Sequence, residues 1–324
     1  MINPKIKEAI AAVTQKQKEC KKVVKKYATF MTITTFVAPI LIFIIMERRF
    51  EIFFLLFAVI PIYVTPRIPK VEKTLEEYRS FYKNVFVSTV IADIDSNFTY
   101  EPQKGITANE FYKSGIYRRV NFYGEDQISG TYANVKFRLS EAIKVEKTYD
   151  SNGSKNPYLA LLRVSKVIYD EYMDFNGTVL VCEFYKNFKG QTILADKKVL
   201  NTKISGEKEI LDDTEFNNEF RVFTDDKIEA RYLLSPGFMQ RLREVKQGFD
   251  SAVSLSAAFM DDKFYLFLNG AKDRFKSSLF DSPLSLSDAQ AIKDEILRLL
   301  HVIDELNLSL YLYKLKSYWN IYSY

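Results

Sequence analysis

Residues 27–46 read YATFMTITTFVAPILIFIIM, a run of 20 residues without a charged side chain. At about 1.5 Å per helical residue, such a run covers the roughly 30 Å of a bilayer core. After residues 47–49 (ERR), residues 50–65 (FEIFFLLFAVIPIYVT) are apolar again apart from one glutamate, and Pro66 ends the run. The second run is near the lower length limit for a span. The pattern predicts a two-span transmembrane helical hairpin over 27–66, and the alternative is one span followed by an interfacial or buried helix.

Positive charge is concentrated ahead of this apolar segment. Residues 1–26 hold eight lysines against Glu8 and Glu19, a net charge of +6, whereas the whole chain carries +5, so residues 27–324 sum to −1. Further cations follow the second run: Arg67, Lys70, Lys73, Arg79 and Lys83. Because positive flanks stay in the cytoplasm, we expect both ends of the chain there. The arginines of the 47–49 connector oppose this orientation, and a periplasmic domain is the alternative.

Residues 1–26 are expected to form a basic amphipathic helix. Asn3 and Pro4 supply a cap and a first-turn signal. A heptad seam follows, with one polar member: Ile6, Ile10, Val13, Gln17, Cys20, Val24 and Tyr27. We expect this helix to lie on anionic lipid headgroups through Lys16, Lys18, Lys21, Lys22, Lys25 and Lys26. The alternative is a short coiled coil with a partner or a second copy of the chain.

The composition excludes several classes of protein. With 324 residues, 47% hydrophobic and 27% charged, the chain is globular rather than disordered. Its two cysteines, Cys20 and Cys182, cannot form a disulfide framework or a zinc module. Its single histidine, His301, is expected on a solvent-facing helix surface and excludes His-rich metal sites. A near-neutral folded region is a poor nucleic-acid binder, so we expect no nucleic-acid partner.

Residues 70–324 predict a mixed, mainly antiparallel α+β domain. A helix over 71–94 should leave the membrane, and later helices are expected over 225–234, over 235–248 and from the capping box at Ser287. Alternating apolar runs predict strands over 117–123, 127–146, 177–185, 220–223, 253–260 and 264–268. Cys182 falls in the middle of a strand and should be a buried thiol. A division into two subdomains near residue 205 is an alternative.

One loop is a candidate ligand or partner site. It lies between two predicted strands, it carries adjacent acids, and its glycines permit close backbone approach: Tyr123, Gly124, Glu125, Asp126 and Gly130, with Arg231 as a further member. Paired acids can bind a cation or divide acid and base roles, but in turns they are more often solvated, so a bulged turn is the alternative. The sequence holds no phosphate-binding loop, nucleophile elbow or zinc motif. We therefore expect no catalytic residues, no cofactor and no metal.

Four N-x-S/T triplets bear on location. Each has an acid two residues before the asparagine, a pattern similar to the bacterial N-glycosylation acceptor: Asn97, Asn152, Asn176 and Asn307. Aspartate and asparagine are also ordinary turn residues, and Asn307 is expected to end a helix. Glycosylation would require a periplasmic domain, against the lysine distribution, so we treat these asparagines as alternative sites.

Over roughly residues 75–285 the chain resembles a bacterial membrane family known as domain of unknown function 3137. The resemblance rests on residues 100–102 (YEP), 111–114 (FYKS), 123–130 (YGEDQISG), 140–141 (SE), 177–189, 215–223 (EFNNEFRVF), 228–236 (IEARYLLSP), the Met239 helix and the hairpin 253–268. It implies a helical-hairpin anchor followed by an α+β region. It implies no activity, cofactor or catalytic residue.

Taken together, these features predict a non-enzymatic protein of the bacterial inner membrane whose cytoplasmic domain binds a protein or peptide. An aromatic tail could add contact surface: Tyr311, Tyr313, Tyr318, Trp319, Tyr322 and Tyr324. One alternative is a membrane-tethered enzyme or small-ligand sensor that uses the Glu125/Asp126 loop. The other is a periplasm-facing glycosylated envelope protein.

Overall fold

The computed structural model describes residues 3–33, 40, 68–117, 122–144, 175–184, 187–188, 190–199, 204–271 and 275–321. The chain divides into two units. Unit 1 comprises Met1–Ile94 and Arg274–Lys293, and unit 2 comprises Asp95–Asp273 and Asp294–Tyr324. The alternative boundary near residue 205 is not seen, because strands before and after that residue pair in one sheet. Each unit is described by itself below.

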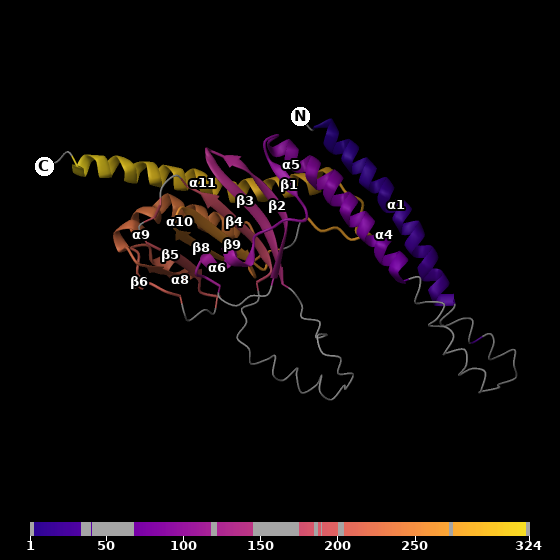
Figure 1. The fold of residues 1–324 in the computed structure, drawn as a ribbon, viewed down its shortest axis with the longest axis horizontal. Helices are drawn as coiled ribbons and strands as arrows, with labels where there is room; N and C mark the ends of the chain where they lie inside the picture. The colour runs from indigo at the N-terminus through magenta and orange to yellow at the C-terminus, as the bar shows by residue number, and fades with distance from the viewer. Residues whose placement is uncertain are drawn as a thin grey trace. The chain divides into compact units, whose positions relative to one another are not determined.

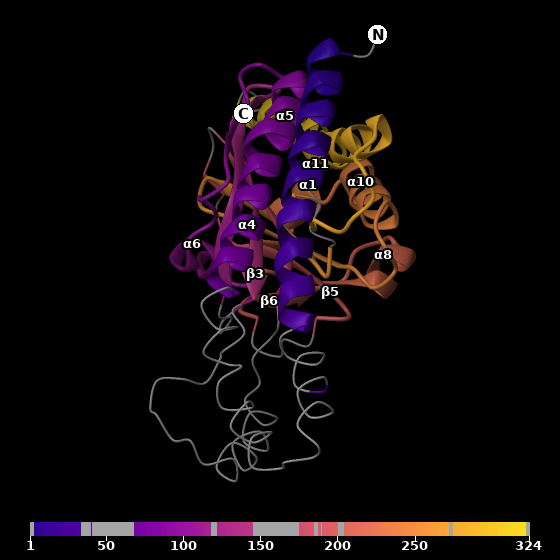
Figure 2. The same ribbon diagram turned by 90° about the vertical axis from the view of Figure 1, so that its right-hand side faces the viewer.

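Unit 1 is built on two helical segments that flank the apolar run. The first is α1 (Pro4–Thr32), and the second consists of α4 (Ile68–Phe81), the π-helical turn η3 (Tyr82–Val87) and α5 (Ser88–Ile94). Asn3 caps α1 as predicted, since its side chain accepts from the Lys5 amide at 3.0 Å. In Figures 1 and 2, α1 and α4 lie side by side and antiparallel. The chain therefore leaves α1 and enters α4 at the same end of the pair.

The predicted seam of α1 is buried inside unit 1. The side chains of Ile6, Val13, Gln17, Cys20 and Val24 are at most 7% exposed, together with Ala9 in place of the predicted Ile10. From the other segment, Tyr78, Tyr82, Phe86 and Val90 are also buried. The apolar stripe is thus covered by the chain itself. This differs from both arrangements expected from the sequence, a stripe immersed in lipid and a stripe paired with another chain.

An extended segment of residues 275–281 completes unit 1. Phe275, Ser277 and Leu279 are buried, whereas the alternate residues Lys276 and Phe280 are exposed. The Tyr78 hydroxyl lies 3.1 Å from Ser277 Oγ, and Gln17 donates to two carbonyl oxygens of the segment. The polar member of the seam therefore satisfies backbone acceptors that would otherwise be buried without donors.

Most of the predicted hairpin, residues 34–39 and 41–66, lies outside the described residues. Among the helices that the structure does describe, none combines the length and the apolar character that crossing a bilayer requires.

The described residues of unit 2 form a nine-stranded antiparallel sheet with the order β1-β2-β3-β4-β9-β8-β5-β7-β6. The strands are β1 (Thr99–Glu101), β2 (Phe122–Tyr132), β3 (Val135–Lys144), β4 (Gly177–Glu183), β5 (Thr192–Asp196), β6 (Glu207–Glu209), β7 (Phe220–Thr224), β8 (Ser254–Met260) and β9 (Lys263–Asn269). The helices are α6 (Ala108–Lys113), α8 (Thr214–Glu219), α9 (Lys227–Leu233), α10 (Pro236–Gln247) and α11 (Leu286–Ile321), whose first turns belong to unit 1. The predicted α+β class with a mainly antiparallel sheet is confirmed.

Helices cover both faces of this sheet. Phe238 of α10 packs edge-on against Phe259 and Phe264, with ring centroids 5.8 and 5.9 Å apart. On the opposite face, Phe111 of α6 packs against Phe267 at 5.1 Å. Figure 2 shows α10 on one side of the strands and α6 on the other. Because both faces are covered, β4, β8 and β9 are buried at nearly every position.

Several element boundaries differ from the sequence predictions. Residues 127–146 do not form one strand, because Ala133 and Asn134 turn with φ of 47° and 64° and join β2 to β3. Without glycine, this two-residue turn carries little sequence signal. Tyr117 belongs to the aromatic core rather than to a strand. The last helix begins at Leu286, two residues earlier than a cap at Ser287 would place it, and Ser285 donates its amide and hydroxyl to the Asp288 carboxylate.

Candidate functional site

The predicted ligand loop lies inside strand β2, at a bulge. Glu125 is opposite Glu141, and Ile128 is opposite Leu139, so β2 holds one residue more than β3 between these pairs. Asp126 occupies the bulge with φ of 56°, in the left-handed region that aspartate tolerates better than most residues. The bulged-turn alternative therefore describes the backbone correctly, although it falls within a strand.

The segment after β1 holds this bulge in place. Asp126 donates its amide to Pro102 O at 3.1 Å, and Gln127 donates to Lys104 O at 3.0 Å. Gly105 and Gly124 meet backbone to backbone, since a Cβ on Gly105 would lie 2.2 Å from the carbonyl carbon of Gly124. The backbone that approaches Gly124 closely is that of Gly105, and this contact depends on the absence of both side chains.

Three carboxylates converge at the bulge. Oxygens of Glu125, Asp126 and Glu141 all lie within 4.8 Å of one another. Asp126 is fully buried, Glu141 is 4% exposed, and Glu125 is half-buried. The sequence does not predict Glu141 as a site residue. Glu141 lies opposite Glu125 only because of the register of β2 on β3, and the sequence pattern does not indicate that register.

Tyr100 of β1 closes one side of this carboxylate cluster. Its hydroxyl donates to Asp126 Oδ1. Burial raises the pKa of Tyr100, and the negative charges of Asp126, Glu141 and Glu125 raise it further. The phenol therefore stays protonated at physiological pH and acts as a hydrogen-bond donor to the cluster.

The arrangement fits the chemistry of a hard divalent cation. Calcium takes oxygen ligands at about 2.3–2.6 Å, so oxygens on opposite sides of one ion are separated by about 5 Å at most. The spread of 4.8 Å among these oxygens lies within that limit. The three carboxylates can therefore chelate a divalent cation through their oxygens.

The remaining predicted loop residues are placed differently. Tyr123 is 50% exposed. Gly130 faces the Phe98 ring, where a Cβ would lie 2.6 Å from Cδ1. Arg231 is not part of this site, because it bonds Glu209 of β6 at 2.9 and 3.0 Å. Strands β2 and β6 are near opposite edges of the sheet, about 33 Å apart at roughly 4.8 Å per strand.

The candidate glycosylation sites also differ in their surroundings. Asn97 and Asn176 are exposed, and their backbone amides donate to the side-chain oxygens of Asp95 and Asn269. Asn307 does not end a helix but lies within α11, and its side chain donates to Ala133 O at 3.0 Å. Asn152 lies outside the described residues.

Three further predictions concern single side chains. Cys182 is buried as expected, and burial raises the pKa of its thiol. His301 is half-buried rather than solvent-facing, with its ring 6.2 Å from that of Tyr132. For the aromatic tail, α11 continues through Ile321, beyond which the residues are not described.

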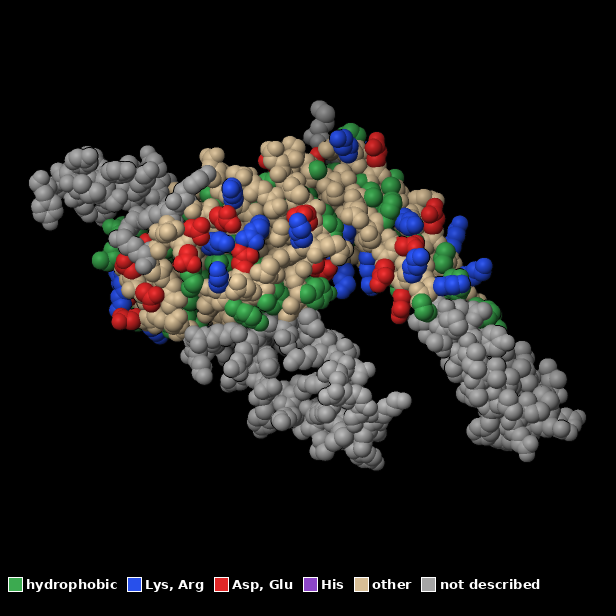
Figure 3. Space-filling view, viewed as in Figure 1, with side chains coloured by type: hydrophobic (Ala, Val, Ile, Leu, Met, Phe, Trp, Pro, Cys, Tyr) green, Lys and Arg blue, Asp and Glu red, His purple; other side chains and the backbone are tan. Residues whose placement is uncertain are grey.

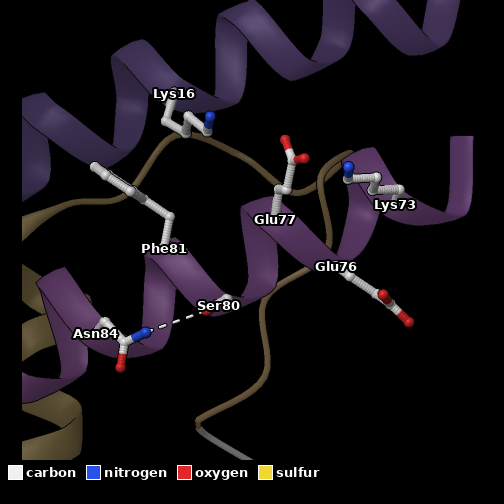
Figure 4. Close-up of a pocket in the computed structure, with 7 residues that line it drawn as sticks. All are labelled: Lys16, Lys73, Glu76, Glu77, Ser80, Phe81 and Asn84. Atoms are coloured by element: carbon white, nitrogen blue, oxygen red, sulfur yellow. Dashed lines mark hydrogen bonds between the residues drawn. The ribbon is translucent and has the colours of Figure 1, made fainter. Parts of the chain in front are cut away.

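Unit 1 has a shallow groove on its surface. It has a volume of about 530 Å³, and Figure 4 shows its lining of Lys16 from α1 and Lys73, Glu76, Glu77, Ser80, Phe81 and Asn84 from α4 and η3. Asn84 donates to Ser80 Oγ at 3.1 Å. Charges of both signs share this lining, which favours solvation over the recognition of one ligand.

Comparison with known proteins gives a family match over part of the chain. Residues 173–308 match the family described as Protein of unknown function (DUF3137). The three clustered carboxylates lie outside that range. No curated protein matches the chain. The crystal structure of the mycobacterial trehalose monomycolate transport factor A, TtfA, aligns over 68% of this chain and 93% of its own, with 10% identity and a TM-score of 0.36. A likeness at that level carries no argument about fold or function.

Proposed function

We propose that this chain, whose residues 173–308 match the DUF3137 family, is a non-enzymatic protein of the bacterial inner membrane whose unit 2 binds a protein or peptide in the cytoplasm. Residues 27–66 cross the bilayer as a two-span hairpin. The family description assigns no function, so the proposal rests on the physical features of this chain.

The observation that carries the anchor is the antiparallel packing of α1 on α4. A single span between them would place the two helices on opposite sides of the membrane, where they could not pack. Their burial against each other in unit 1 supports an even number of crossings. An odd number would expose the seam residues Val13 and Cys20, at a cost of about 1.5–3 kcal/mol for each large apolar side chain.

The surface of α1 changes where the apolar run begins. Phe30 and Ile33 are 37% and 49% exposed, and Ile40 is 57% exposed. Exposed large apolar side chains of this kind are expected where a surface contacts lipid. Lysines precede this point on α1, and by the positive-inside rule they favour a cytoplasmic location for both units.

The partner-binding part of the proposal is supported by the β6 edge of the sheet. Ile210, which follows β6, is 67% exposed, and Ile228 of α9 is 72% exposed. Ion pairs join the two elements, between Lys227 and Glu207 at 3.0 Å and between Arg231 and Glu209 at 2.9 Å. Two exposed isoleucines beside a short edge strand form a surface that a peptide can cover with apolar side chains and backbone hydrogen bonds.

Site-specific photo-crosslinking tests this assignment. A photoreactive residue in place of Ile210, and separately of Ile228, is incorporated into the full chain in cells. We expect both positions to capture the same partner. The control position is Lys113, an exposed residue on α6. If Ile210 and Ile228 capture nothing beyond what Lys113 captures, this surface is not the binding site.

A second candidate function is favoured by the carboxylate cluster, namely sensing of a divalent cation by Glu125, Asp126 and Glu141. A cation present at about a hundredfold excess over its dissociation constant adds about 2.7 kcal/mol of stability. Calcium or manganese should therefore raise the melting temperature of the full chain, and E141Q should abolish the rise. The control D212N changes a side chain that is 98% exposed and should keep it. Equal shifts in all three proteins would exclude the site.

The periplasmic alternative requires the opposite topology. It would leave Asn97 and Asn176 available to a glycosyltransferase. Labelling of unit 2 from outside the cell distinguishes the two topologies.

A further inference from the structure

The turn of residues 278–281 displays a large aromatic side chain on the surface of unit 1. Phe280 is 63% exposed, although its neighbour Leu279 is 2% exposed. An exposed phenylalanine offers a large apolar surface to a binding partner or to lipid.

The turn is pinned by hydrogen bonds from within. Asp281 donates its amide to Ser278 O at 3.1 Å, and the Asp281 carboxylate accepts from the Ser278 amide at 2.7 Å. Ser278 Oγ accepts from the Phe280 amide at 3.3 Å. These bonds close a tight turn with Phe280 near its tip.

The turn is also fixed to α1. Gln17 donates to Leu279 O at 3.1 Å and to Asp281 O at 3.0 Å, so it holds the residues on either side of Phe280. Lys21, one helical turn further along, lies 3.4 Å from Asp281 O. Because Phe280 is displayed by a fixed turn, ordering it on a ligand costs little conformational entropy.

Basic side chains lie on the part of α1 that holds this turn. Lys21 is at the turn itself, and Lys18 and Lys25 are three and four residues away on α1, which places them on the same helix face. Lys276 is also exposed and lies four residues before Phe280 on the same segment. Figure 3 shows Lys and Arg side chains, with Asp and Glu side chains among them, over the part of unit 1 where α1 ends and α4 begins.

This site is also close to the predicted membrane boundary. Lys21 precedes Tyr27, the first residue of the apolar run, by six residues, which is about 9 Å along a helix. The headgroup layer on each side of a bilayer is about 5–8 Å thick. A modest tilt of α1 therefore brings Phe280 and these lysines to the depth of the headgroups.

We propose that Phe280 and the lysines Lys18, Lys21, Lys25 and Lys276 form a docking surface for anionic phospholipid headgroups, with Phe280 entering the interface. The proposal rests on the proposed membrane hairpin and adds to it a second, electrostatic contact that fixes the tilt of unit 1. The occupant is a lipid surface because its negative charge complements the lysines and because the same chain enters the bilayer a short distance away.

Tryptophan quenching in nanodiscs tests the proposal with the full chain. The sole native tryptophan is removed by W319F, and F280W introduces the reporter at an exposed position. Discs contain brominated phosphatidylcholine with or without an equal part of phosphatidylglycerol. We expect a blue-shifted, quenched indole in the discs with phosphatidylglycerol. Neutralising three lysines (K18Q, K21Q, K25Q) should weaken lipid contact on the order of a hundredfold and restore an unquenched signal.

Two matched reporters complete the design. I228W places the reporter in unit 2 at a side chain that is 72% exposed, away from the fixed turn and its lysines. We expect little quenching at this position. F54W lies in the predicted second span and should be quenched with either lipid. A quenched F54W with an unquenched F280W would overturn the docking surface and leave the hairpin intact. An unquenched F54W would instead reject the hairpin. Quenching of F280W that ignores both phosphatidylglycerol and the lysine substitutions would also overturn the proposal.

Discussion

Gln17 donates its side-chain amide to the carbonyl oxygen of Leu279 across 3.1 Å, although the two residues are 262 positions apart in the chain. Its second amide hydrogen reaches Asp281 O at 3.0 Å. In the sequence, Gln17 is a polar interruption of a heptad seam. In the structure, it joins the first helix to the segment that precedes the last one.

The first prediction concerns this residue. Q17L would improve an ordinary coiled-coil seam, but here it removes the donor to the buried Leu279 carbonyl and leaves Asp281 O with Lys21 alone. An unsatisfied buried acceptor costs about 1–3 kcal/mol, so we expect Q17L to lower the free energy of unfolding by that amount, measured by urea denaturation of the full chain in detergent. The control Q15L changes an exposed side chain that bonds Glu19 and should have little effect. A more stable Q17L would show that these hydrogen bonds do not hold the turn.

The second prediction concerns the pH dependence of unit 1. Hydrogen bonds from Lys293 and Asn3 hold the pKa of Asp93 below its usual range. A carboxyl group with a depressed folded-state pKa stabilises the protein above its unfolded pKa, near 4, and loses that contribution as the pH falls through the folded value. D93N should therefore be less stable than the natural protein at pH 7, and the difference should shrink below about pH 4.

Thermal unfolding across this pH range measures the difference. The matched control is E72Q, which neutralises an exposed glutamate of α4 and should show no such convergence. A stability difference for D93N that stays constant down to about pH 3 would mean that Asp93 acts through its shape and not its charge.

The third prediction concerns the backbone contact behind the carboxylate cluster. G105A places a Cβ 2.2 Å from the carbonyl carbon of Gly124, which only a shift of backbone can relieve. Overpacking of this kind costs typically 1–3 kcal/mol, and it should also move the bulge that carries Asp126. In the control G237A, the nearest atom is Glu305 Oε2 at 2.9 Å, at the flexible end of a side chain, so the effect should be small. Comparable stability of the two variants in chemical denaturation would contradict the close approach.

Much of the fold could be predicted because its signals are local. The cap at Ser235 with Pro236 after it, the strand that contains Cys182 and the apolar stripe of α11 depend on residues close in sequence. Each follows from periodicity or from capping preferences.

The parts that could not be predicted depend on pairing between distant segments. Glu141 joins Glu125 only through the register of β2 on β3. The sequence prediction includes Arg231 with the acidic loop, whereas the strand order places its partner Glu209 at the other edge of the sheet. The sequence predicts the apolar seam of α1, but a helical pattern does not indicate which surface covers that seam.

The central claim is that residues 27–66 cross the membrane twice and leave unit 2 in the cytoplasm, and cysteine labelling tests it most directly. The natural cysteines, Cys20 and Cys182, are both buried. R49C reports on the connector and K113C on an exposed position of unit 2, each probed in intact spheroplasts with a membrane-impermeant maleimide and again after lysis. We predict that R49C reacts in intact spheroplasts and that K113C reacts only after lysis. Reaction of K113C in intact spheroplasts would contradict the account.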